Sequence, residues 1–135
     1  MSYKITDIEG VGPAYGTKLA KADIKTTADL LSKCATPAGR KKVAAAAGIS
    51  EGQILKWTNL ADLMRISGVG PQFSELLEAA GVDTVKELRN RNAANLATAM
   101  AEVNGVKKLT RVSPAARTVG SWVKAAKSMD PVIKY

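Results

Sequence analysis

Residues 8–19 read IEGVGPAYGTKL, and residues 66–77 read ISGVGPQFSELL. Both segments contain Gly-Val-Gly-Pro, at Gly10–Pro13 and at Gly68–Pro71, with an isoleucine two residues in front. Glycine tolerates the backbone angles of a tight turn, and proline suits the first position of a helix. Each copy therefore predicts a tight turn that leads into a helix. The copies lie 58 residues apart (68 minus 10), which marks an internal repeat.

The repeat extends beyond the two turns. At the same offset, Leu19, Ala22, Ile24, Thr26 and Leu30 match Leu77, Ala80, Val82, Thr84 and Leu88. Further along, Trp57 and Met64 match Trp122 and Met129 at an offset of 65. The seven additional residues (65 minus 58) fall in the loop around Gly105 to Arg111. We therefore expect a single domain over residues 1–135, built from two repeats of about 1–66 and 67–135.

Helix signals run along the whole chain, and no segment alternates apolar and polar residues as a strand does. Proline follows an N-cap residue at Thr36-Pro37, and capping boxes begin at Ser50 and Thr84. We expect helices over residues 13–22, 27–31, 37–47, 50–65, 71–80, 93–103 and 113–129. The predicted fold is all-α, one compact helical domain with pseudo-twofold symmetry.

The C-terminal helix, residues 113–129, is not explained by two identical repeats placed one after the other. The helix over residues 50–65 precedes the second turn, whereas only about seven residues precede the first. We expect the C-terminal helix to fold back beside the first turn and complete the first repeat. The alternative is that it docks on a neighbouring molecule and builds a dimer or a chain.

The composition argues against catalysis. The 135 residues include no histidine and one cysteine, which excludes Ser-His-Asp and Cys-His arrangements. No cluster of cysteine or acidic residues has the spacing of a zinc or calcium site. We expect no enzyme and no metal site. The aromatic pairs Trp57 with Trp122 and Tyr15 with Phe73 occupy helical core positions, where packing is favoured over base stacking.

The same composition bounds the compartment. Cys34 has no partner for an intramolecular disulfide, which fits a reducing environment. The N-terminal residues lack a secretory signal, and no apolar run reaches the length of a membrane span. We expect a cytoplasmic protein with no membrane partner.

The charge points to a polyanion. The chain has 20 basic and 12 acidic residues, a net charge of +8. Residues 33–42 carry Lys33, Arg40, Lys41 and Lys42 without an acid, and residues 107–127 hold a second such cluster. Basic surfaces of this size most often bind nucleic acid.

The two turn segments resemble the helix-hairpin-helix motif. Their arrangement is similar to a bacterial helix-hairpin-helix family of unknown function, over nearly the whole chain. In the second segment, the residues in register are Leu63, Ile66, Gly68, Val69, Gly70, Ser74 and Leu77. The first segment departs from the motif, with Gly16 at the small position and no leading helix in the sequence.

The resemblance implies non-sequence-specific DNA binding, in which backbone N–H groups of the glycine hairpin approach phosphates. Free amides at the positive end of a helix dipole suit that role. The implied contacts are Gly10, Val11, Gly12, Gly68, Val69 and Gly70. Lys18, Lys21, Arg40, Lys41 and Lys42 are candidate supporting cations. Glu75 and Glu78 follow the second turn, which favours a purely structural role there.

The sequence leaves several alternatives open. The same scaffold fits a protein-interaction or self-assembly module that presents its helices to a partner or to itself. RNA is a weaker choice than DNA, because no aromatic-rich strand platform is predicted. We expect no cofactor, although some members of the motif class hold a potassium or sodium ion on the hairpin carbonyls.

Overall fold

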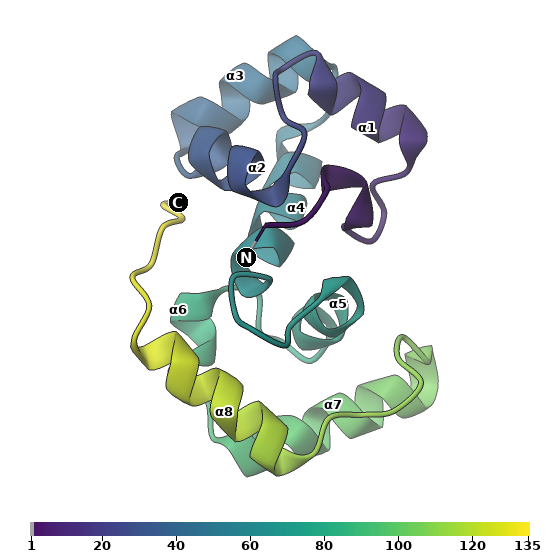
Figure 1. The fold of residues 1–135 in the computed structure, drawn as a ribbon, viewed down its shortest axis with the longest axis vertical. Helices are drawn as coiled ribbons and strands as arrows, with labels where there is room; N and C mark the ends of the chain where they lie inside the picture. Colours follow the sequence, from purple (N-terminus) through teal and green to yellow (C-terminus); the bar gives the residue numbers. More distant parts are fainter. Residues whose placement is uncertain (1) are drawn as a thin grey trace. The chain divides into compact units, whose positions relative to one another are not determined.

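The computed structural model of the chain describes residues 2–135, which form helices joined by short connections (Figure 1). A short 3-10 helix, η1 (Ile5–Asp7), precedes the α-helices. The α-helices are α1 (Pro13–Ala20), α2 (Thr27–Cys34), α3 (Pro37–Ala47), α4 (Glu51–Leu63), α5 (Pro71–Ala79), α6 (Val85–Leu88), α7 (Ala93–Lys107) and α8 (Ala116–Lys127). Across residues 2–135 the only strand-like pairing is an isolated bridge between Lys4 and Thr26. The predicted all-α class is confirmed.

The chain divides into two compact units. The first comprises the residues up to Asp62 together with Val132–Tyr135, and the second comprises Leu63–Pro131. The boundary at Asp62 lies close to the repeat boundary that we expected at residue 66. Each unit contains one Gly-Val-Gly-Pro turn and the helices that pack around it.

Capping residues fix the helices of the first unit. The Thr26 hydroxyl accepts a hydrogen bond from the Asp29 amide at 3.1 Å, and the Asp29 carboxylate accepts from the Thr26 amide at 3.1 Å. This capping box starts α2. Thr36 caps α3, which ends at Gly48 in the left-handed conformation with φ 69°. The core of this unit includes the fully buried Ile8, Leu19, Ile24, Leu30, Ile54 and Trp57.

The last residues of the chain belong to the first unit. The Lys134 amide donates to the Ala35 carbonyl at 2.7 Å. The Tyr135 hydroxyl donates to Asn59 Oδ1 at 3.0 Å. These contacts attach the C-terminal segment to α4 and to the end of α2.

The second unit has a continuous apolar core formed by its own helices. The core residues are Leu63, Ile66, Val69, Leu76, Leu77, Val82, Val85, Leu88, Leu96, Met100, Val119, Trp122, Val123 and Ala126. Burying side chains of this size supplies most of the stability of a small helical unit. Side chains from α8 contribute four of these residues, so this helix is an integral part of the second unit.

We expected the C-terminal helix to complete the first repeat, and the structure assigns α8 to the second unit. Trp122 of α8 lies beside Phe73, with ring centroids 5.3 Å apart, and its indole nitrogen lies against Gly68. The corresponding place beside the first turn is taken by α4. Its Trp57 lies 5.0 Å from Tyr15 between ring centroids and against Gly10. Each turn is therefore covered by a helix that follows it in the chain.

Candidate functional site

The first glycine turn, Ile8–Pro13, is held by a few defined interactions. Gly10 has φ +89°, a conformation that side chains with a Cβ rarely adopt. The Val11 amide donates to the Ile8 carbonyl at 3.0 Å, and the Val11 side chain is buried. Gly12 is extended and precedes α1, where the Gly16 amide makes the first helical bond to the Gly12 carbonyl at 2.8 Å.

The second glycine turn, Ile66–Pro71, has the same geometry. Gly68 has φ +92°, and the Val69 amide donates to the Ile66 carbonyl at 3.0 Å. Gly70 is extended before α5, and the Ser74 amide donates to the Gly70 carbonyl at 2.9 Å. The sequence repeat is therefore reproduced as a repeat of backbone conformation.

Each turn leaves a group of backbone amides without an acceptor. Within residues 2–135, the amides of Gly10, Gly12, Ala14 and Tyr15 have no hydrogen-bond partner. The equivalent amides in the second unit are those of Gly68, Gly70, Gln72 and Phe73. Neither helix has a capping side chain at its start, because a glycine holds the N-cap position.

This set differs from the one that we inferred from sequence. The amides of Val11 and Val69 are satisfied inside their turns and do not face a ligand. The amides of Ala14 and Gln72, at the second helical position, take their place in the free groups. The signal for them was present in the sequence, because a proline that follows a glycine N-cap leaves the next two amides uncapped.

The space around these amides is open on one side and closed on the other. A Cβ added at Gly12 or Gly70 would have no atom within 4 Å. A Cβ at Gly10 would lie 3.6 Å from the indole nitrogen of Trp57, which is 1% exposed and has no hydrogen-bond partner. The two tryptophans are buried, as their core positions predicted. The turns are therefore open beside Gly12 and Gly70 and covered by a tryptophan beside Gly10 and Gly68.

A family comparison bears on these two turns. One family model matches residues 9–129, which include both Gly-Val-Gly-Pro segments and α1 to α8. The chain belongs to the DUF4332 family. The family is described as a domain of unknown function. No curated protein and no solved structure matched the chain.

Two lysines that we predicted beside the first turn of this DUF4332 chain occupy different positions along α1. Lys18 Nζ lies 5.5 Å from the centroid of the ring of Tyr15, a residue of the first turn of α1. Lys21 is the C-cap residue of α1, at the opposite end of the helix from the turn. A helix of eight residues is about 12 Å long, so Lys21 is a weaker candidate for the same anion.

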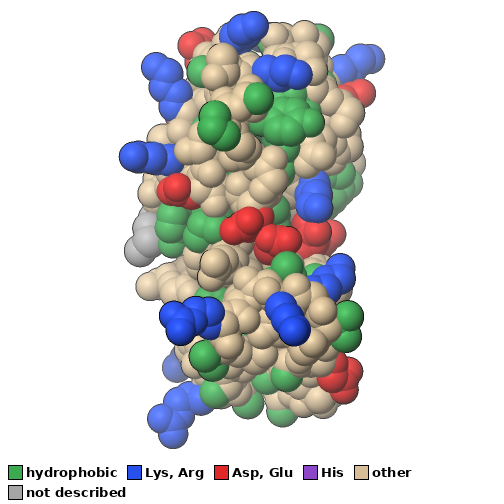
Figure 2. All heavy atoms as spheres, turned by 90° about the vertical axis from the view of Figure 1, so that its right-hand side faces the viewer, with side chains coloured by type: hydrophobic (Ala, Val, Ile, Leu, Met, Phe, Trp, Pro, Cys, Tyr) green, Lys and Arg blue, Asp and Glu red, His purple; other side chains and the backbone are tan. Residues whose placement is uncertain are grey.

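The basic residues of the 33–42 cluster differ in burial, because successive residues of a helix face different directions. Arg40 is 6% exposed, and its guanidinium donates to the carbonyls of Cys34 at 3.0 Å, Ala35 at 3.2 Å and Lys134 at 2.8 Å. Arg40 is therefore a structural residue, which corrects its assignment as a nucleic-acid contact. Lys41 and Lys42 remain exposed on α3. The surface in Figure 2 shows dispersed Lys and Arg side chains with acidic ones among them.

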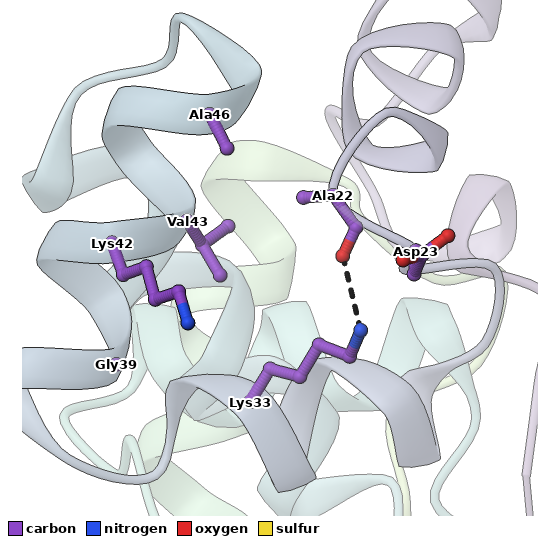
Figure 3. Close-up of a pocket in the computed structure, with 7 residues that line it drawn as sticks. All are labelled: Ala22, Asp23, Lys33, Gly39, Lys42, Val43 and Ala46. Carbon is purple, nitrogen blue, oxygen red and sulfur yellow. Dashed lines mark hydrogen bonds between the residues drawn. The ribbon is translucent and has the colours of Figure 1, made fainter.

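Lys42 borders a cavity of about 460 Å³ in the first unit, shown in Figure 3. Lys33 projects from the other side, and its ammonium donates to the Ala22 carbonyl at 3.2 Å. Val43 and Ala46 supply an apolar wall. The sequence cluster therefore lines a cavity with Lys33 and Lys42, turns Arg40 inward and leaves Lys41 on the surface.

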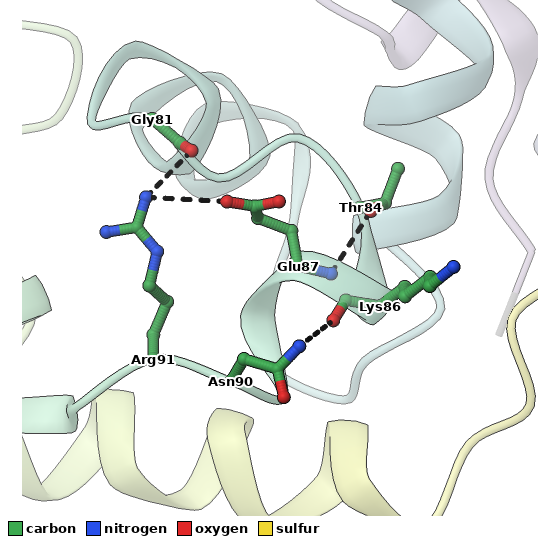
Figure 4. Close-up of polar contacts among 6 residues, drawn as sticks. All are labelled: Gly81, Thr84, Lys86, Glu87, Asn90 and Arg91. Carbon is green, nitrogen blue, oxygen red and sulfur yellow. Dashed lines mark hydrogen bonds and ion pairs between the residues drawn. The ribbon is translucent and has the colours of Figure 1, made fainter.

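Arginines of the second unit also serve the fold. Arg91 donates to the Gly81 carbonyl at 2.9 Å and forms an ion pair with Glu87 at 3.7 Å (Figure 4). At Thr84, where we expected a capping box, the Thr84 hydroxyl accepts from the Glu87 amide at 3.3 Å, while the Glu87 carboxylate pairs with Arg91. Arg89 donates to the carbonyls of Lys127 and Met129.

Among residues 2–135, no group of three or more cysteine or acidic residues is placed to hold a metal ion. In that part of the chain, no helix has the length and apolar character needed to cross a membrane. Cys34 is buried, and burial raises the pKa of its thiol to about 11.

Proposed function

We propose that this DUF4332 chain binds the backbone of duplex DNA, without sequence specificity, through two helix-hairpin-helix units. The observation that carries the proposal is the group of four unpartnered amides at each glycine turn. Such amides lie at the positive end of a helix dipole and form hydrogen bonds to phosphate oxygens. Contacts of this kind position a protein on the duplex without reading its bases.

Access at the turns supports the proposal. Gly12 and Gly70 have open space where a side chain would stand, so a phosphate can approach the main chain closely. Val11 and Val69 act indirectly, because their buried side chains and internal hydrogen bonds set the direction of the neighbouring amides. Lys18 adds a positive charge over the ring of Tyr15, whose amide belongs to the first group. The net charge of +8 adds a favourable long-range field.

The test is a titration of fluorescent duplex DNA at several salt concentrations. The logarithm of the affinity should fall linearly with the logarithm of the salt concentration, with a slope of about −0.9 for each phosphate neutralised. Gly12→Glu places a carboxylate where the phosphate would lie, and the backbone there has no need of glycine (φ −84°). We expect this variant to bind much more weakly.

Gly52→Glu is the matched control. Gly52 lies on the exposed first turn of α4 in the same unit, and a Cβ there also meets nothing within 4 Å. The two variants carry the same change in net charge, so a difference between them reports the location of the site. Equal loss in both variants, or no binding by the unaltered protein at low salt, would refute the proposal.

A second candidate, the interaction or self-assembly module, is favoured by one observation. Val106 and Val112 are 84% and 76% exposed, near the end of α7 and in the connection to α8. Exposed apolar side chains of this kind occur at interaction sites. Sedimentation over a range of protein concentrations tests self-assembly. A mass that rises with concentration and returns to the monomer in Val106→Ser/Val112→Ser would support this candidate.

A further inference from the structure

A cavity of about 540 Å³ lies in the second unit, at the start of α5. Gln72 of α5 lines it on one side. The other side is formed by the end of α7 and the connection that follows, which contribute Lys108 and Arg111. Both cations are exposed, and neither makes a hydrogen bond or ion pair through its side chain within residues 2–135. The cavity is thus lined by two available positive charges and an amide side chain.

The connection that carries these cations is held in place by Asn104. This side chain is 9% exposed. Its Nδ2 donates to the Thr110 carbonyl at 3.0 Å and to Ser113 Oγ at 3.1 Å, while its Oδ1 accepts from the Thr110 amide at 2.9 Å. Lys108 and Arg111 therefore project from a fixed segment, which reduces the entropy lost on binding an anion.

Lys108 occupies a position that usually favours glycine. It caps α7 in the left-handed conformation, with φ 51° and ψ 48°. Gly48 caps α3 in the first unit with φ 69° and ψ 40°. A lysine in this conformation is sterically disfavoured relative to glycine. Strain of this kind suggests that the lysine side chain serves a purpose other than stability.

The connection is also where the two units differ in length. Residues 108–115 join α7 to α8, whereas residues 48–50 join α3 to α4. The cavity and its two cations therefore have no counterpart in the shorter connection of the first unit. In the second unit, α5 itself carries Glu75 and Glu78 and no basic residue. The added residues bring positive charge to a helix start that otherwise lacks it.

We propose that this cavity takes a backbone phosphate of the nucleic acid bound at the second glycine turn. Lys108 and Arg111 neutralise the phosphate, and the Gln72 side-chain amide donates a hydrogen bond to it. The inference rests on the proposed function and goes beyond it, because it makes the connection between α7 and α8 part of the binding surface. It also assigns the second unit its own cations.

The experiment compares Lys108→Ala/Arg111→Ala with Lys124→Ala/Lys127→Ala in the duplex DNA titration. The control lysines are exposed residues of α8 in the same unit, so both double variants lose two positive charges. Losing the one phosphate held by the cavity should lower the magnitude of the salt slope by about 0.9. By the same relation, affinity at 0.1 M salt should fall by about eightfold. The control should retain the slope of the unaltered protein.

Lys108→Gly separates binding from folding. Glycine relieves the left-handed strain, so we expect a higher unfolding midpoint together with a lower affinity, by less than the roughly eightfold loss of the double variant because Arg111 remains. A purely structural role for Lys108 predicts no loss of affinity. Circular dichroism of each variant checks that the helices are intact.

The outcomes distinguish the two proposals. Binding by the unaltered protein that survives Lys108→Ala/Arg111→Ala, or falls equally in the control, would overturn the inference and leave the proposed function standing. No binding by the unaltered protein at low salt would overturn both.

Discussion

Replacing Gly68 by alanine tests whether the left-handed turn and its tryptophan cover are essential to the second unit. Gly68 has φ +92°, and a Cβ there would lie 3.2 Å from the indole nitrogen of Trp122. The backbone strain costs about 1–2 kcal/mol for a residue with a Cβ. The ring must also move by a few tenths of an ångström within a packed core, which adds to the loss. We expect a total loss of about 2–3 kcal/mol in the free energy of unfolding.

Gly70→Ala is the internal control, two residues away in the same turn. Its φ is −91°, and a Cβ there would have no atom within 4 Å. Alanine reduces the entropy of the unfolded chain but is a poorer N-cap than glycine. These effects oppose each other, so the change should stay within about 0.5 kcal/mol.

Urea unfolding followed by circular dichroism measures the difference. With a slope of about 1–3 kcal/mol per molar urea, the midpoint of Gly68→Ala should fall by about 1 M relative to Gly70→Ala. Gly10→Ala should lose less than Gly68→Ala, because its Cβ would keep 3.6 Å from Trp57. Equal midpoints for Gly68→Ala and Gly70→Ala would show that this reasoning about the turn is wrong.

Three further predictions concern residues away from the glycine turns. Arg40→Ala should lower the free energy of unfolding by about 3 kcal/mol, because three backbone carbonyls lose a charged donor. Thermal unfolding measures this loss, and Arg40→Lys should not restore the lost stability. Cys34 should not react with a thiol reagent at about pH 8 unless denaturant is added. Its thiol is buried, and with a pKa of about 11 it is neutral at that pH. Rapid reaction of the native protein would contradict the buried position. Hydrogen bonds from the Lys25 and Thr26 amides hold the pKa of the Asp29 carboxyl below its usual range, so its contribution to stability is present at neutral pH and is lost as the pH falls through that lowered value. Asp29→Asn should therefore flatten the acid side of the stability profile, and an unchanged profile in urea unfolding would count against the capping box.

The sequence predicted the helix starts at the glycine turns, because proline and glycine act locally. Pro13 and Pro71 are the first residues of α1 and α5, as expected. The predicted helix ends were wrong where a side chain forms a hydrogen bond to a residue several positions away. The last helix was expected from residue 113, but the Ser113 hydroxyl accepts a hydrogen bond from Asn104, and α8 begins at Ala116.

The end of α7 shows the same effect. The sequence predicted a helix over residues 93–103. The Asn104 side chain instead bonds to Thr110, and the helix continues to Lys107 before Lys108 adopts the left-handed conformation. A lysine in that role carries no recognisable signal in a single sequence.

For the candidate site, the glycines were identified from sequence, whereas the roles of the cations were not. From the sequence, we took Arg40 as one of the cations that support phosphate binding. Its spacing from Val43 and Ala47, three and seven residues on, places it on the buried face of α3. This helical spacing could be read from the sequence, and it predicts the burial of Arg40 better than the neighbouring charges do. The cavity at Lys108 depends on how a loop packs, which no local pattern specifies.

The return of Val132–Tyr135 to the first unit has a practical consequence for dissecting this protein. A fragment cut at the repeat boundary would lack the Lys134 carbonyl, which accepts a hydrogen bond from Arg40. It would also lack the Tyr135 hydroxyl, which donates to Asn59. Measurements on such a fragment would understate what the N-terminal half can do. A faithful version needs the final tetrapeptide restored through a short linker, and a purification tag is better attached at the opposite terminus.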